Sequence, residues 1–291
     1  LPICVRQIWL WHGMPLKKIG YCDDAFKNLR KCRTILTALL NPYARLKPYC
    51  TPTSADFFTP FLKEAFRLPE AQIWKTGLPR CDAFFSDKRE PLSENFRARF
   101  ENARIFLYMP TFRMSSNRDG SPFNPFTESF GFDEKEFTSF LEAQNIVFFY
   151  KPHFVDSALK VKMASSRFLC ICDDDFDDLY VLLNSVDVLL TDYSSVYFDF
   201  LAARKPAFLL AFDYEQYTKN SRAHFFDMYT EMHGEYCKSW QEFYEKAESK
   251  LNSQPYITEL EQDRQKFAEF LDGKSSEKLF SFMRVDVMRN V

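Results

Sequence analysis

The chain has 291 residues, which suits two domains of ordinary size better than one. Hydrophobic residues make up 46% of it and charged residues 27%, and these values exclude a disordered, collagen-like or coiled-coil chain. The formal net charge of −2 is not the strongly basic balance of a nucleic-acid-binding protein. Only 7 glycines are present, and neither of the two commonest glycine-rich nucleotide-binding patterns occurs.

The first hundred residues predict part of an α/β domain. Short apolar runs indicate strands, and apolar residues spaced three and four apart indicate helices. The expected elements are a strand over residues 3–10, helices near 28–40 and 57–67, and a short strand over 72–75. Because the chain opens on the first strand without an initiator Met or a signal-peptide pattern, we expect natural N-terminal sequence to be missing.

Residues 104–212 carry the clearest pattern. Apolar runs of about five residues, the usual length of a strand, alternate there with helical patterns. The expected strands are 104–109, 146–150, 167–171, 186–190 and 207–212, and the expected helices are 134–143, 176–184 and 195–203. Asp133 is a suitable N-cap for the first of these helices, with Glu136 three residues later. The alternation predicts βαβ units and a mostly parallel, doubly wound sheet.

The remaining sequence divides the chain into three predicted parts. After Ser239 it is helical and charged, with apolar residues spaced for one buried face. These residues are Trp240, Phe243, Tyr244 and Ala247. Residues 91–101 are expected to connect the first two parts. We predict a partial N-terminal α/β domain, a second α/β domain and a set of C-terminal helices, over residues 1–100, 101–238 and 239–291.

Neither the cysteines nor the acidic residues indicate a metal. The eight cysteines form no C-x-x-C pair and no repeated ligand spacing, so we expect buried free thiols rather than zinc or disulfides. The acidic run over 173–178 is typical of a solvated helix start, where carboxylates interact favourably with the helix dipole. We therefore predict no metal and no cofactor.

Polar groups follow five of the expected strands, at the sheet edge where open α/β folds bind ligands. The segments are W-H-G-M-P-L-K-K-I-G at 11–20, T-G-L-P-R-C-D at 76–82, Y-M-P-T-F-R at 108–113, K-P-H at 151–153 and T-D-Y-S-S at 191–195. Two of the four histidines, His12 and His153, follow strands in this way, which favours a functional role for both. His224 and His233 have no such context and are interpreted as incidental.

Phosphate is the ligand that these segments suit best. The start of a helix at 191–195 offers backbone N–H groups and a positive dipole end to an anion, although a simple capped helix start has the same sequence. Arg80 and Arg113, each beside Gly or Thr near a strand end, suit bidentate binding of a phosphate. Alone, either could be an ordinary surface charge.

In order and spacing, the five segments and A-F-D-Y-E-Q-Y at 211–217 resemble those of the CDP-glycerol glycerophosphotransferases. This family contains the primases and polymerases of teichoic acid and has relatives in capsule synthesis. The resemblance implies a GT-B architecture, two Rossmann-like domains with the active site in the cleft between them. The first domain would be incomplete at its N-terminus, and the second would bind the nucleotide donor. Phe154 stands where the family usually has Pro, and 232–234 is only loosely similar to a Pro-Gly loop of relatives.

The resemblance also implies an activity. A polyol phosphate, most often glycerol phosphate, moves from a CDP-activated donor to a hydroxyl of a teichoic-acid or capsular glycan, and CMP is released. His12 is then the general base for that hydroxyl, and His153 binds the donor pyrophosphate. The implied substrate-binding residues are Trp11, Gly13, Met14, Pro15, Arg80, Thr111, Arg113, Lys151, Thr191, Asp192, Ser194 and Ser195.

The partners implied by the resemblance are CDP-glycerol or CDP-ribitol as donor and a glycan or lipid-linked molecule as acceptor, with no nucleic acid. The implied location is the cytoplasm, at the inner face of the cell membrane. Two alternatives stay open. A GT-B glycosyltransferase that uses a nucleotide sugar would be stabilised against heat by UDP rather than CDP. A non-catalytic remnant would bind the donor without turnover.

Overall fold

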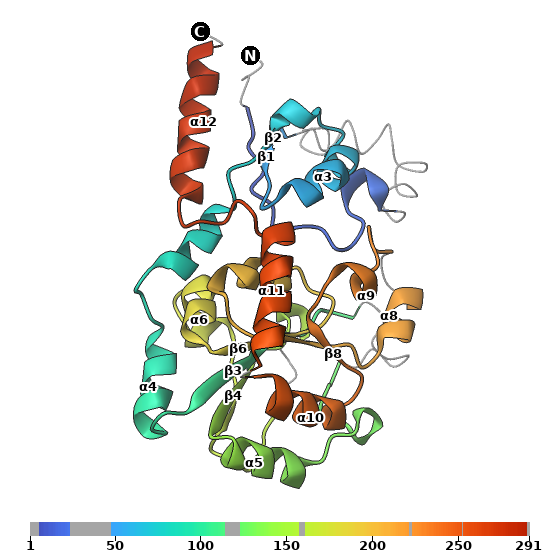
Figure 1. Cartoon of the computed structure of the whole chain (residues 1–291), viewed down its shortest axis with the longest axis vertical. Coiled ribbons are helices and arrows are strands. Elements are labelled where there is room, and N and C mark those ends of the chain that lie inside the picture. Colours follow the sequence, from blue (N-terminus) through green and yellow to red (C-terminus); the bar gives the residue numbers. More distant parts are fainter. Residues whose placement is uncertain are drawn as a thin grey trace. The chain divides into compact units, whose positions relative to one another are not determined.

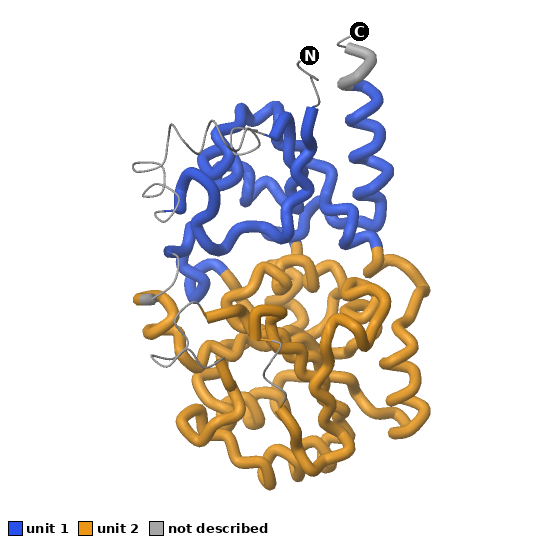
Figure 2. Tube along the Cα trace, turned by 180° about the vertical axis from the view of Figure 1, so that it is seen from behind, with its two compact units in different colours: residues 1–82, 222–231, 265–291 blue, residues 83–221, 232–264 orange. Residues whose placement is uncertain are grey.

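The protein is described from a computed structural model, over residues 6–23, 48–113, 123–156, 161–220, 223–251 and 253–289. The helix expected near 28–40 lies outside these residues. The chain forms two compact units, shown in Figure 2. Unit 1 contains residues 1–82, 222–231 and 265–291, and unit 2 contains residues 83–221 and 232–264.

Unit 2 is built on a six-stranded sheet with the order β5-β4-β3-β6-β7-β8, in which every neighbouring pair is parallel. The strands are β3 (Arg104–Tyr108), β4 (Ile146–Tyr150), β5 (Phe168–Cys170), β6 (Val188–Thr191), β7 (Ala207–Leu210) and β8 (Glu235–Cys237). The predicted parallel sheet is therefore confirmed, and β8 is a strand that the sequence did not indicate.

Aromatic packing holds helices against one face of this sheet. The helix α5 (Glu134–Ala143) begins at the predicted cap, because the carboxylate of Asp133 accepts a hydrogen bond from the backbone N–H of Glu136 at 2.8 Å. Beside it lies α10 (Trp240–Lys250), and the rings of Phe140 and Tyr244 meet at 4.9 Å (Figure 1). The fully buried Trp240 contacts rings of both α5 and the sheet, so the large aromatic side chains form one continuous core.

The other helices of unit 2 are α4 (Pro91–Arg99), α6 (Leu179–Ser185), α7 (Val196–Phe200), α8 (Tyr214–Asn220) and most of α11 (Gln254–Phe267). The acidic run does form a helix start, because Asp178 is the N-cap of α6 and accepts from the N–H of Tyr180 at 2.7 Å.

The predicted connection over 91–101 is wrong, because α4 occupies most of it. Phe96 of this helix packs edge-on against Phe149 of β4 at 5.2 Å. Arg97 donates to the carbonyl oxygen of Ser185 and to the carboxylate of Asp187, both at 2.9 Å. These contacts place α4 in unit 2, so the boundary falls after Asp82 rather than after residue 100.

The C-terminal helices do not form a separate part either. Whereas α10 joins the core of unit 2, α12 (Ser275–Arg289) belongs to unit 1, where Leu279 packs with Cys50 and Trp74. The carboxylate of Asp82 accepts from the first two backbone N–H groups of α12, both at 2.8 Å. The predicted third part, 239–291, is thus divided between the two units.

Unit 1 contains the two-stranded parallel sheet of β1 (Thr51–Pro52) and β2 (Ile73–Trp74), with α3 (Thr59–Phe66) and α9 (Met228–Glu231). The strand expected over 3–10 is reduced, in the part that the structure describes, to a single bridge between Ile8 and Cys50.

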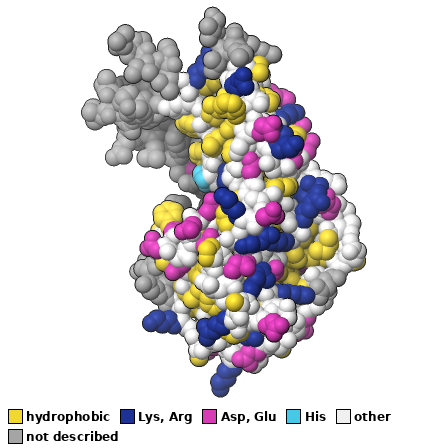
Figure 3. All heavy atoms as spheres, turned by 90° about the vertical axis from the view of Figure 1, so that its left-hand side faces the viewer, with side chains coloured by type: hydrophobic (Ala, Val, Ile, Leu, Met, Phe, Trp, Pro, Cys, Tyr) yellow, Lys and Arg dark blue, Asp and Glu magenta, His cyan; other side chains and the backbone are white. Residues whose placement is uncertain are grey.

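On the face drawn in Figure 3, acidic and basic side chains are interspersed. Among the described residues, no helix is long and apolar enough to span a membrane.

Candidate functional site

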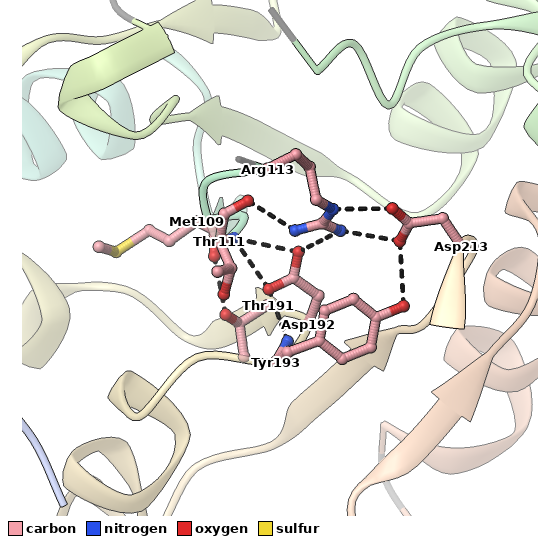
Figure 4. A network of polar contacts seen from close by, with 7 residues as sticks. All are labelled: Met109, Thr111, Arg113, Thr191, Asp192, Tyr193 and Asp213. Carbon is pink, nitrogen blue, oxygen red and sulfur yellow. Dashed lines mark hydrogen bonds and ion pairs between the residues drawn. The ribbon is translucent and has the colours of Figure 1, made fainter. Parts of the chain in front are cut away.

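A buried arginine joins the loops at the carboxyl ends of three strands in unit 2 (Figure 4). The guanidinium of Arg113 donates to the two oxygens of Asp213 at 2.7 and 2.9 Å, and it lies 2.8 Å from a carboxylate oxygen of Asp192. Its third nitrogen donates to the carbonyl oxygen of Thr111 at 2.6 Å. Burial lowers the pKa of Arg113, but the two carboxylates outweigh burial and raise that pKa overall. The guanidinium is therefore charged and committed to protein oxygens.

Asp192 ties the loop after β3 to the loop after β6. Its buried carboxylate accepts from the backbone N–H of Thr111 at 2.8 and 3.0 Å and from that of Tyr193 at 2.6 Å. The hydroxyl of Thr191 donates to the carbonyl oxygen of Met109 at 2.7 Å. Sequence reasoning placed these residues at one sheet edge correctly, and their contacts show that they fix the loops there.

The loop before α7 offers two backbone donors. Within the part of the chain that the structure describes, the N–H groups of Ser194 and Ser195 donate to no acceptor. The Ser194 hydroxyl accepts from the N–H of Val196 at 3.4 Å, and both serines are half-buried. Because Tyr193 is held on Asp192 and Asp213, the two serines that follow it are held in turn.

The loop after β4 carries Lys151 and His153. The ammonium of Lys151 is buried and pairs with Asp173 at 2.8 Å. The ring of His153 lies against Phe112 with centroids 5.6 Å apart, and its Nδ1 accepts from the N–H of Val155 at 3.3 Å. A neutral imidazole that accepts at Nδ1 carries its proton on Nε2, so His153 is arranged as a hydrogen-bond donor.

In unit 1, the segment after the first expected strand exposes His12 and buries the residues after it. Met14 is fully buried and accepts from the hydroxyl of Thr53 at its sulfur, 3.7 Å away. Gly13 and Pro15 are buried as well. The Met14 side chain anchors the segment to the core, so we do not assign this side chain to substrate binding.

The 76–82 segment packs against the C-terminal part of unit 1. Gly77 has a φ of +76°, and a Cβ there would lie 2.6 Å from the carbonyl oxygen of Phe270, so only glycine fits this close approach. Arg80 donates to the carbonyl oxygen of Trp11 at 3.0 Å. Arg80 therefore supports the backbone next to His12, a role that the sequence did not indicate.

Sequence reasoning missed three polar residues. Asp213 lies three residues after the last residue of β7, and its place near a strand end was an available signal. His233, interpreted as incidental, lies with Nδ1 2.6 Å from the fully buried carboxylate of Asp263, which also accepts from the hydroxyl of Tyr197. His233 and Asp263 are 30 residues apart, so no local pattern could have paired them.

Comparison with known proteins agrees with the resemblance noted in the sequence. Residues 5–284 match the family model described as CDP-Glycerol:Poly(glycerophosphate) glycerophosphotransferase. The teichoic acid glycerol-phosphate primase of Bacillus subtilis (strain 168) is 24% identical over 277 residues, which are 95% of this chain and 67% of that protein. The teichoic acid ribitol-phosphate polymerase TarL of Staphylococcus aureus is 28% identical over 218 residues, which are 72% of this chain but only 36% of TarL.

Solved structures show the same fold. A structure of a variant of the wall teichoic acid polymerase TagF, soaked with CDPG, superposes with a TM-score of 0.76 at 19% identity, over 100% of this chain and 70% of that one. A putative UDP-N-acetylglucosamine 2-epimerase from Listeria monocytogenes gives a TM-score of 0.55 at 14% identity, over 94% of this chain and 67% of that one. The predicted GT-B-like fold is thereby confirmed.

Proposed function

The chain belongs to the CDP-glycerol:poly(glycerophosphate) glycerophosphotransferase family, and we propose that it transfers a polyol phosphate from a CDP-activated donor to a hydroxyl of a teichoic-acid or related glycan acceptor. Glycerol phosphate is the group that we expect first. The acceptor oxygen bonds to the distal phosphorus of the donor as the bond to CMP breaks, and the hydroxyl proton leaves to a base. The family match over nearly the whole chain is the observation that carries this proposal.

The donor pyrophosphate requires groups that neutralise its charge without reorganising, since phosphoryl transfer depends mostly on positioning and electrostatic stabilisation. The N–H groups of Ser194 and Ser195 and the Nε2–H of His153 are arranged as donors in unit 2. We assign the pyrophosphate to these groups. Arg113, committed to two carboxylates, supports them by holding the loops in place.

The acceptor hydroxyl requires a base, and His12 is the residue we assign to it. Its side chain is exposed, and an imidazole can take a proton near neutral pH. The buried residues that follow it, with Met14 anchored on Thr53, hold the segment that carries it.

The test is release of CMP by the full-length protein. It is incubated with CDP-glycerol, CDP-ribitol or a UDP-sugar, each with and without teichoic-acid acceptors. We expect acceptor-dependent CMP release from a CDP-polyol. Turnover of only the UDP-sugar would favour the glycosyltransferase alternative, and calorimetric binding of CDP-glycerol without CMP release would favour the remnant.

A further inference from the structure

The imidazole of His12 rests on the indole of the preceding residue. The ring centroids of Trp11 and His12 are 4.6 Å apart, with the ring planes inclined by 36°. The indole is itself held in place, because Phe66 meets it edge-on at 5.1 Å and Trp9 stacks on it at 6.3 Å and 19°. Phe66 is only 3% exposed, so this aromatic support is fixed to the core of unit 1.

The backbone at Trp11 gives a second, independent observation. Its φ is 55°, in the left-handed region where residues with large side chains are rare and where glycine would be the easy choice. The guanidinium of Arg80 donates to the Trp11 carbonyl oxygen at 3.0 Å and so helps to hold this conformation. Because the backbone conformation disfavours tryptophan, the contacts of the indole, rather than the backbone, explain why a tryptophan stands here. Unfavourable backbone conformations of this kind cluster at functional sites.

We propose that Trp11 is a positioning residue for His12, which holds the imidazole in the orientation that receives the acceptor proton. This inference rests on the proposed role of His12 as general base. As the acceptor oxygen bonds to phosphorus and CMP leaves with the electrons of the broken bond, the hydroxyl proton passes to a ring nitrogen of His12. The electron-rich indole face then attracts the imidazolium that forms. Trp11, expected from the sequence to bind substrate, thus acts through its neighbour.

Kinetics of Trp11→Leu and Trp11→Phe test the positioning role. Leucine removes the aromatic face, and phenylalanine restores a smaller one. We expect Trp11→Leu to lower kcat by about 10- to 100-fold, the scale of a misplaced catalytic group, with the KM for CDP-glycerol unchanged. Trp11→Phe should recover most of the rate. The matched control is Phe61→Leu, which removes a half-buried aromatic ring of α3 in the same unit and should slow turnover far less.

An NMR measurement reads the ring contact without depending on activity. In protein with labelled histidines, the resonances of His12 are assigned by their loss in His12→Ala. The indole ring current should displace the His12 ring protons, and this displacement should disappear in Trp11→Leu and partly return in Trp11→Phe.

The results of these experiments distinguish a positioning role of Trp11 from a purely structural one. Loss of the ring-current displacement together with the fall in kcat supports the inference. An unchanged kcat in Trp11→Leu overturns it, and so does an equal loss of rate and of thermal stability in Trp11→Leu and Phe61→Leu, which would mark both residues as structural. Turnover at the wild-type rate by His12→Ala would instead exclude His12 as the base, and the inference would fail with that assignment. The ring contact would still be visible in the wild-type spectrum.

Discussion

Replacing Arg113 with methionine distinguishes a structural guanidinium from one that binds phosphate. The side chain is 5% exposed and pairs with Asp192 at 2.8 Å and Asp213 at 2.7 Å. Methionine leaves both carboxylates buried without their cation. Since removing one partner of a buried ion pair costs about 3–5 kcal/mol, we expect the free energy of unfolding to fall by about that amount.

Urea unfolding followed by circular dichroism measures this loss. Arg99→Met, at an exposed arginine of α4 in the same unit, is the matched control and should change the free energy of unfolding by less than about 0.5 kcal/mol. Adding Asp213→Asn to Arg113→Met removes one orphaned charge and should recover part of the loss. A wild-type urea midpoint for Arg113→Met, combined with weak binding of CDP-glycerol, would refute the structural role and restore the phosphate role inferred from the sequence.

Three further predictions concern the loops and the histidines. Ser195→Pro removes one of the two assigned backbone donors at a φ of −65°, which proline adopts, and should weaken CDP-glycerol binding by one charge-assisted hydrogen bond, about 1.5–3 kcal/mol; unaltered affinity in titration calorimetry would remove that N–H from the donor site. His12→Ala should lower turnover by about 10²–10⁴-fold with donor affinity kept, whereas His153→Ala should lose donor affinity as well as rate; identical binding defects in both would contradict the separate roles. Burial, reinforced by Lys17, lowers the pKa of His224 from 6.5 to about 4. The unfolded chain therefore binds this proton first, so the free energy of unfolding should fall as pH drops from about 6.5 to about 4, and less steeply in His224→Gln.

The parallel sheet could be predicted because its strands are covered on both faces. All five residues of β4 are buried, so the strand is a continuous apolar run, and its predicted bounds, 146–150, are those of the structure. The bounds of α5 were equally clear, because the Asp133 cap and the amphipathic pattern are both local. Local signals of this kind can be recognised in the sequence without knowledge of the tertiary fold.

The helix α4 could not be predicted from its own residues. It is mostly polar, and Ser93 is its only residue classed as buried in the structure. Its anchoring contacts come from Ser185 and Asp187, which lie 88 and 90 residues further along the chain from Arg97. Contacts so distant in sequence leave no periodic signal.

The candidate site shows the same limit. The strand-end rule brought Thr111, Arg113 and Asp192 to one sheet edge, as the structure has them. It assigned Arg113 to phosphate, however, because its partner Asp213 lies 100 residues away and only the fold shows that the guanidinium is already occupied. Residue type and position were predictable here, whereas the pairing was not.

The transfer itself is the most direct test of the proposed function. Full-length protein is incubated with CDP-glycerol labelled with ¹⁴C in the glycerol, in the presence of a teichoic-acid acceptor, and both CMP and labelled acceptor are quantified. We predict equal amounts of the two products from the wild-type protein and almost none from His12→Ala. Release of CMP without label in the acceptor, or no release from either CDP-glycerol or CDP-ribitol, would contradict a polyol phosphate transferase.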